Sequence, residues 1–194
     1  ITPDAERTMV TFLGIAGKIS EKDIDEKAIK ASEMIFLEGY LWDEGEPKSA
    51  FDKAMSLSKK KAMSLSDQFC VERNKDSFLN LVKNELDITF ANEQEIKSLI
   101  NAKNLEEVIT FGKNLGKLLV ITLGEKGSLA IKNNEVIECE SKKNLQILDL
   151  TGAGDLFAGG FLDGFINGFS IKKCLENGTE MSSKIIQKFG ARLN

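Results

Sequence analysis

Apolar and polar positions alternate along this chain with two periods. Short apolar runs of four to six residues stand between stretches in which apolar residues recur at helical spacing. The runs are typical of buried strands, and the spaced stretches are typical of helices that cover a sheet. Their alternation predicts βα units around a mainly parallel sheet, which is the α/β class of fold.

The same patterns predict the individual elements. Strands are expected at residues 9–15, 34–37, 62–65, 87–91, 118–123, 128–131 and 136–139. Helices are expected at residues 22–32, 47–60, 76–84, 105–114, 154–166 and 171–189, and another begins at Asn92. Pro47 suits the first position of a helix, and Asn92 followed by Glu95 fits a capping box. No linker rich in Pro, Gly or Ser interrupts the pattern, so we expect one α/β domain over residues 1–194.

Composition narrows the class of protein. The 194 residues can bury one sizeable core, and 42% apolar with 29% charged residues is an ordinary globular composition. The net charge is -4 and the basic residues are dispersed, so we expect no nucleic-acid partner. No apolar run approaches membrane-spanning length, and the first residues do not resemble a signal peptide. We therefore expect no membrane partner.

Cysteine and histidine usage limits the chemistry further. Cys70, Cys139 and Cys174 lie far apart without a Cys-x-x-Cys pair, which predicts reduced thiols in a cytoplasmic protein. The chain has no histidine. Nucleophilic catalysis by a Ser-His or Cys-His pair and histidine-ligated metal sites are therefore excluded within these residues.

The most informative segment is residues 148–161, Leu-Asp-Leu-Thr-Gly-Ala-Gly-Asp-Leu-Phe-Ala-Gly-Gly-Phe. Gly152 and Gly154 let the backbone approach a ligand closely, and the helix expected next would direct unpaired N–H groups at an anion. Asp155 lies in that first turn, where a carboxylate can accept the proton of an attacking alcohol. The structural alternative is an ordinary turn in which Asp155 only complements the helix dipole.

Residues 149–160 resemble the C-terminal signature of the PfkB (ribokinase-like) family of sugar and nucleoside kinases. The resemblance implies that Asp155 is the catalytic base. It also implies that the amides of Gly152, Ala153 and Gly154 form an anion hole. ATP and Mg²⁺ are the cofactors that the family implies, and an alkali cation such as K⁺ near the loop that opens this string is common in it.

Two further segments fit the same family. Thr122, Gly124 and Gly127 follow the clearest strand and resemble a Thr-x-Gly-x-x-Gly segment, which implies contacts with the phosphates and ribose of ATP. Asn92 and Glu95 fit an Asn-x-x-Glu motif, which implies that Glu95 helps to hold Mg²⁺ through water. Without the resemblance, the first segment is an ordinary β-turn and the second is a plain capping box.

Other segments supply candidate substrate contacts. Arg7, in the polar segment 2–8, could meet a phosphate or a substrate hydroxyl, although an isolated arginine is more often a surface ion-pair partner. Residues 38–42 contain the only Tyr and the only Trp, which could flank a base or sugar, and residues 66–70 are another candidate rim. The alternative for the two aromatic residues is partial packing in the core. Together with Phe-Ala-Asn-Glu, these segments are similar to bacterial adenosine-kinase-like members of the family.

The resemblance implies a ribokinase-like, three-layer Rossmann-type sheet with helices on both faces. It also implies that an N-terminal part, with most of the lid that covers the sugar, is absent from these residues.

These features favour an ATP-dependent phosphotransferase that acts on a primary hydroxyl of a small-molecule nucleoside or sugar, of the adenosine, ribose or fructose type. The alternative is a nucleotide-binding module without catalysis or an inactive kinase fragment. An NAD-dependent oxidoreductase is disfavoured, because Phe157 stands where a dinucleotide fingerprint needs its third glycine. A homodimer is the assembly to be tested.

Overall fold

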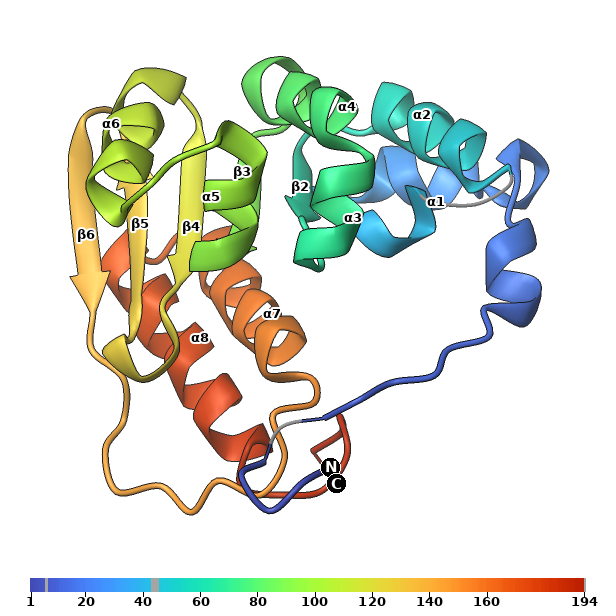
Figure 1. The fold of residues 1–194 in the computed structure, drawn as a ribbon. Helices are drawn as coiled ribbons and strands as arrows, with labels where there is room; N and C mark the ends of the chain where they lie inside the picture. The colour runs from blue at the N-terminus through green and yellow to red at the C-terminus, as the bar shows by residue number, and fades with distance from the viewer. Residues whose placement is uncertain (6, 43–45, 194) are drawn as a thin grey trace. The chain divides into compact units, whose positions relative to one another are not determined.

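The computed structural model describes residues 1–5, 7–42 and 46–193 (Figure 1). The predicted polar segment 2–8 and the loop after residue 42 each include residues outside this description, namely Glu6 and residues 43–45. The chain forms two compact units. One comprises Phe12–Ile121 and Ile131–Val136, and the other comprises Ile1–Thr11, Thr122–Ala130 and Ile137–Asn194. The expectation of a single domain stays a prediction.

Six strands form one sheet in the order β1-β2-β3-β4-β5-β6. They are β1 (Ile35–Glu38), β2 (Lys61–Ser64), β3 (Ile88–Asn92), β4 (Leu118–Thr122), β5 (Ser128–Lys132) and β6 (Glu135–Cys139). Each lies within one or two residues of an expected strand, because short apolar runs between polar segments define buried strands well. The predicted α/β class is thereby confirmed.

The strand pairing explains why residues that follow different strands share one edge of the sheet. β1 and β2 run parallel with Ile35 opposite Lys61, and β2 and β3 run parallel with Ala62 opposite Ile88. β5 and β6 are joined by only two residues, which both have positive φ, as a hairpin turn between antiparallel strands requires. The sheet is therefore mixed, with its first strands parallel.

The unit that contains β1 to β4 carries most of the shorter helices. They are α1 (Glu26–Ala31), α2 (Pro47–Leu57), α3 (Gln68–Arg73), α4 (Lys75–Asn80), α5 (Glu93–Ile100) and α6 (Leu105–Leu115). Single helical turns occur at η1 (Gly14–Lys18), η2 (Glu21–Asp23), η3 (Gly39–Trp42), η4 (Leu81–Glu85) and η5 (Gly124–Lys126), the last of which belongs to the other unit.

Local capping explains where several of these helices begin. The side chain of Asp25 accepts hydrogen bonds from two amides of α1, and Asn104 accepts one from the Glu107 amide at the start of α6. Pro47 is the first residue of α2, as predicted. Helix α3 was not expected; Asp67 is its N-cap, and an Asp in this place is the sequence signal that indicates it.

The core of this unit is formed by the strands and by the inward faces of the helices. Leu119, Val120 and Ile121 of β4 are fully buried. Gly112 of α6 lies so close to Ile131 of β5 that an added Cβ would be 2.6 Å from the Ile131 Cδ1 atom. A side chain at Gly112 is therefore excluded by packing rather than by backbone conformation.

The other unit is dominated by α7 (Ala153–Ile166) and α8 (Ile171–Ile185), which lie side by side (Figure 1). Small residues permit this close approach. An added Cβ at Gly178 of α8 would lie 2.7 Å from the backbone oxygen of Phe157 in α7. Both helices were expected, and α8 ends four residues before the predicted Phe189.

The strand expected at residues 9–15 is wrong. Residues 9–13 are irregular, and Gly14 begins a helical turn with a φ of +58°. Met9, Val10 and Phe12 are 65%, 100% and 95% exposed. An apolar run becomes a strand only when another strand pairs with it, and none of the strands in the described residues does so.

Within the described part of the chain, no helix has both the length and the apolar character needed to cross a bilayer.

Candidate functional site

Asn92 and Glu95 form a reciprocal hydrogen-bonded pair where β3 ends and α5 begins. The Glu95 amide donates to the Asn92 Oδ1 atom at 2.8 Å, and the Asn92 amide donates to the Glu95 Oε2 atom at 2.9 Å. The Asn92 Nδ2 atom also donates to the Glu95 Oε1 atom at 2.6 Å. This is the predicted capping box, and it holds the Glu95 carboxylate in one orientation.

The Glu95 carboxyl group lies in an environment that disfavours its negative charge. Its residue is only 5% exposed. Burial raises its pKa to about 7, the hydrogen bond from the Asn92 amide opposes this rise, and the negative charge of Asp67 adds to it. A carboxyl group with a raised pKa at the carboxyl end of a parallel strand is a candidate functional group.

Asp67 is a further functional candidate, which the sequence indicates only as part of the expected rim at residues 66–70. It follows β2 and caps α3, accepting a hydrogen bond from the Cys70 amide at its Oδ1 atom over 2.6 Å. Because β2 and β3 are parallel neighbours, residues that follow them lie at the same edge of the sheet. That pairing brings the charge of Asp67 close enough to Glu95 to affect its pKa.

The glycine-rich segment forms the start of α7, as predicted. Gly152 is the N-cap and has a left-handed backbone with a φ of +79°. Asp155 lies in the first turn of the helix, and its side chain is exposed. The amides of a first helical turn have no acceptor within the helix. The Ala153 amide instead donates to the Leu150 oxygen at 3.2 Å, so the turn itself already uses this donor.

Asp149 anchors the loop that leads into this helix. It is 1% exposed, and its Oδ1 atom accepts hydrogen bonds from the Thr151 amide at 2.8 Å and the Thr151 hydroxyl at 2.6 Å. Its Oδ2 atom accepts one from the Gly190 amide at 2.8 Å. These bonds, led by that of the Thr151 hydroxyl, hold the pKa of Asp149 below its usual range, and the positive charge of Arg7 contributes.

Arg7 is exposed, and its positive charge interacts electrostatically with the Asp149 carboxylate. Its predicted contact with substrate stays a prediction.

The segment that was compared with a nucleotide-binding turn links β4 to β5. Thr122 ends β4, and the Leu123 amide donates to the Gly127 oxygen at 2.8 Å, which closes the turn. Gly124 has a φ of +60° and no atom within 4 Å of an added Cβ. At Gly127 an added Cβ would lie 2.1 Å from the Cys139 oxygen. Gly127 is thus required by packing, whereas Gly124 leaves an open backbone surface.

The predicted site residues therefore fall into two groups. Asn92 and Glu95, joined by Asp67, belong to the unit of residues Phe12–Ile121 and Ile131–Val136. The remaining candidates all belong to the other unit: Arg7, Thr122, Gly124, Gly127, Gly152, Ala153, Gly154 and Asp155.

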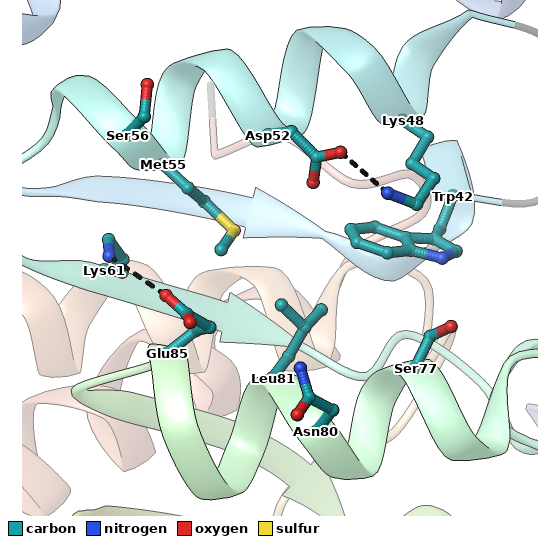
Figure 2. Close-up of a pocket in the computed structure, with 10 residues that line it drawn as sticks. All are labelled: Trp42, Lys48, Asp52, Met55, Ser56, Lys61, Ser77, Asn80, Leu81 and Glu85. Carbon is teal, nitrogen blue, oxygen red and sulfur yellow. Dashed lines mark hydrogen bonds and ion pairs between the residues drawn. The ribbon is translucent and has the colours of Figure 1, made fainter.

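A pocket of about 370 Å³ lies elsewhere, between α2 on one side and α4 with η4 on the other (Figure 2). It is lined by Trp42, Lys48, Asp52, Met55, Ser56, Lys61, Ser77, Asn80, Leu81 and Glu85. Its four charged side chains pair with one another, Lys48 with Asp52 at 2.7 Å and Lys61 with Glu85 at 3.5 Å. Of the candidates named from the sequence, Trp42 of the expected acceptor rim lines this pocket, whereas the predicted catalytic, nucleotide and magnesium residues do not.

Comparisons with known proteins agree with the fold. The chain is 32% identical to an adenosine kinase of Dictyostelium discoideum over 96% of its own length and 60% of that protein. A probable sugar kinase from Rhizobium etli superposes with a TM-score of 0.96 at 34% identity, covering 99% of this chain and 60% of that one. The adenosine kinase of Sinorhizobium meliloti gives a TM-score of 0.88 at 32% identity, over 91% and 56%. The chain thus spans little more than half the length of these relatives.

The family model described as pfkB family carbohydrate kinase matches residues 1–194. The match covers the capping box of Glu95, the helix start that carries Asp155 and the six strands of the sheet. The three relatives described above are two adenosine kinases and a probable sugar kinase. The chain belongs to the pfkB family of carbohydrate kinases.

Proposed function

We propose that the protein transfers the γ-phosphoryl group of ATP to a primary hydroxyl of a nucleoside or sugar. The observation that carries this proposal is the start of α7. There the exposed Asp155 and the first-turn amides occur together, and they follow the N-cap residue Gly152, whose backbone is left-handed. That turn offers donors for a phosphoryl group and an acceptor for a hydroxyl proton within a few residues. Membership in a family of carbohydrate kinases supports the same chemistry.

Asp155 is the proposed general base. Its carboxylate would accept the hydroxyl proton as the acceptor oxygen attacks the γ-phosphorus atom in line with the leaving β-phosphate oxygen. In a loose transition state there is little bond formation to the attacking oxygen, so a weak base suffices. The exposed position of Asp155 leaves its oxygens open to an acceptor hydroxyl.

Backbone amides are the proposed stabilisers of the transferred group. The turn Gly152, Ala153 and Gly154 would donate hydrogen bonds to the phosphoryl oxygens as their charge redistributes. The Ala153 amide would have to exchange its 3.2 Å bond to the Leu150 oxygen for a bond to phosphate. A charged acceptor forms the stronger hydrogen bond of the two, so this exchange is favourable.

Asn92 and Glu95 are the proposed holders of a magnesium ion. Mg²⁺ needs only one or two carboxylates and keeps several waters, and Glu95 beside Asp67 provides such oxygen donors. Burial and like charge disfavour the ionised Glu95, and a cation would offset both. Among the described residues no cluster of three or more Asp, Glu, Cys or His could hold a metal. Because Mg²⁺ keeps several waters, water would supply other positions of its coordination shell. When bound, Mg²⁺ neutralises phosphate charge.

The nucleotide itself would bind at the turn after β4. We propose that Thr122, Gly124 and Gly127 contact the phosphates and ribose of ATP. The open backbone at Gly124 supports a close approach by phosphate. A chain of the same fold with 21% identity, described as a putative Ribokinase II of Escherichia coli, was solved with ATP and Mg²⁺. Arg7 is the proposed contact for substrate, near the same unit's Asp149.

Four further features belong to the proposal. K⁺ would bind oxygens of the loop that carries Asp149, whose carboxylate already accepts three hydrogen bonds, so backbone carbonyls would be the main ligands. The protein would act in the cytoplasm, where its substrates and ATP occur. Adenosine is the first acceptor to test, because two of the relatives described above are adenosine kinases, and a homodimer is the first assembly to test.

The test is phosphoryl transfer from Mg·ATP to adenosine, ribose and fructose, followed by ³¹P NMR of the acceptor. It is run with this chain and with any longer form of the protein, since the relatives are longer. Acceptor-dependent transfer that Asp155→Asn abolishes would support the proposal. Nucleotide binding by calorimetry without transfer to any alcohol would instead favour the non-catalytic alternative.

A further inference from the structure

The C-terminal end of the chain contacts the loop that precedes α7. The Gly190 amide donates to the buried Asp149 Oδ2 atom at 2.8 Å. An added Cβ at Gly152 would lie 2.9 Å from the Ala191 Cβ atom and 3.1 Å from its Cα atom. Gly190 and Ala191, which follow the last helix, therefore lie against the first and the last residue of the loop 149–152. This loop is about forty positions earlier in the chain.

The loop also receives support from the end of α8. The Leu148 amide donates to the Ile186 oxygen at 2.8 Å, and the Asp149 amide donates to the same oxygen at 3.3 Å. These bonds fix the backbone where the loop begins. The Gly190 and Ala191 contacts fix its carboxylate and its last residue, Gly152.

The hydrogen bonds of Asp149 connect the two sides of this arrangement. One carboxylate oxygen accepts from the Thr151 amide and hydroxyl, and the other accepts from the Gly190 amide. A buried carboxylate that loses one of these donors has an unsatisfied hydrogen-bond acceptor, which lowers the stability of the folded state unless another donor replaces it. The loop conformation and the position of Gly190 therefore depend on each other.

The left-handed Gly152 determines where the first-turn amides of α7 point. Its φ of +79° is a conformation that only glycine adopts readily, and Ala191 packs against the face where a side chain would be. The carbonyl of Gly152 accepts from the Leu156 amide at 2.9 Å, which starts the helix. A shift of Gly152 would therefore rotate the following amides away from a bound anion.

We propose that Gly190 and Ala191, through Asp149 and Gly152, are positioning residues for the amides that bind the γ-phosphoryl group of ATP. This inference rests on the proposed function, in which those amides contact the transferred group. The C-terminal contact would matter for ATP, which has a γ-phosphate, and not for ADP, which lacks it. A larger effect on ATP binding than on ADP binding therefore distinguishes a positioning role from a role in the stability of the whole fold.

Two matched truncations test the proposal in this chain. Removal of residues 190–194 deletes both contacts, whereas removal of residues 192–194 keeps Gly190 and Ala191. We expect the longer deletion to raise the dissociation constant of Mg·ATP about tenfold, while that of Mg·ADP changes less than about twofold. The shorter deletion should leave both constants unchanged. An equal loss for ATP and ADP, or no loss for either, would overturn the proposal.

Amide hydrogen exchange provides a readout that needs no nucleotide. The Thr151 amide bonds to Asp149 and the Ala153 amide bonds to Leu150, so their exchange reports the loop conformation. We expect the longer deletion to accelerate exchange at both positions and the shorter deletion to leave it unchanged. Unchanged exchange after the longer deletion would overturn the positioning role. Absence of nucleotide binding by the intact chain would count against the proposed function, and exchange would then decide the positioning role by itself.

Discussion

Gly160 of α7 packs directly against the backbone of Asn177 in α8. An added Cβ at Gly160 would lie 2.7 Å from the Asn177 oxygen and 2.9 Å from the Met181 Cγ atom. The backbone atom cannot move without displacing α8. We therefore expect Gly160→Ala to lower the free energy of unfolding by about 1–3 kcal/mol, measured by urea denaturation.

The neighbouring glycine is a matched control for this prediction. Gly159 has no atom within 4 Å of an added Cβ and lies inside the same helix. Alanine favours a helix over glycine, so Gly159→Ala should raise the free energy of unfolding by about 0.5–1 kcal/mol. Equal effects of the two substitutions would show that the close approach of α7 and α8 does not determine stability here.

The sequence predicted best those features that depend on neighbouring residues. The capping box of Asn92 and Glu95 is local, and the structure has it as expected. The strand expected at residues 118–123 was also predicted, because four apolar residues in a row are too few for a separate helix. Such features need no information about what is nearby in space.

Features that depend on tertiary contacts were missed. The apolar run that contains Val10 was expected to be a strand, but a strand requires a partner, which sequence pattern alone does not reveal. The influence of Asp67 on Glu95 follows from the parallel pairing of β2 and β3. The bond from Gly190 to Asp149 joins residues 41 positions apart, and no local motif indicates it.

The raised pKa of Glu95 predicts a pH dependence of stability. Its pKa is about 7 in the folded protein, against an ordinary value of 4.5 for a glutamate, so the folded state holds this proton more tightly than the unfolded chain. The associated stabilisation is fully present below about pH 4.5 and is lost as the pH rises through about 7. The shift corresponds to roughly 3 kcal/mol as an order of magnitude. Urea denaturation of wild type and Glu95→Gln between pH 5 and pH 8 measures it.

Glutamine keeps the size of the side chain and an oxygen that can accept from the Asn92 amide, but it does not titrate. Relative to wild type, Glu95→Gln should therefore become progressively more stable as the pH rises from 5 to 8. Asp67→Asn provides a second variant, since asparagine also caps helices but removes the negative charge that adds to the effect of burial on the pKa of Glu95. It should shift the wild-type transition to lower pH. A stability difference that is constant across this range would contradict the assignment.

The turn after β4 offers a prediction that separates stability from nucleotide binding. Gly127→Ala would place a Cβ 2.1 Å from the Cys139 oxygen at a φ of +98°, so we expect it to destabilise the fold by roughly 3 kcal/mol or more. Gly124→Ala meets no atom within 4 Å and should cost only about 1 kcal/mol for its φ of +60°. Thermal and urea unfolding measure both.

The Gly124→Ala variant also tests the proposed approach of phosphate to Gly124. A methyl group on this open backbone would obstruct the ligand, so Gly124→Ala should raise the dissociation constant of Mg·ATP by about fivefold or more while the protein remains folded. Calorimetric titration of the folded variant is the measurement. Unchanged ATP affinity would remove Gly124 from the proposed nucleotide site without affecting the assignment of the family.

Asp155→Asn is the most direct test of the proposed chemistry. Asparagine retains the shape of the side chain and can still occupy the first turn of α7, but its amide cannot act as the proton acceptor. We expect the turnover number of an active form of the protein to fall by a factor of about 10² to 10⁴. The dissociation constant of Mg·ATP should change by less than about threefold, because the base contacts the acceptor hydroxyl rather than the nucleotide.

Asp163→Asn is the matched control for this prediction. Asp163 is an exposed aspartate two turns later on the same helix, where its backbone oxygen and its Oδ1 atom accept hydrogen bonds from the Asn167 side chain. Equal turnover in the two variants would show that Asp155 is not the base, and proton removal would then have to be assigned to another acceptor near the hydroxyl.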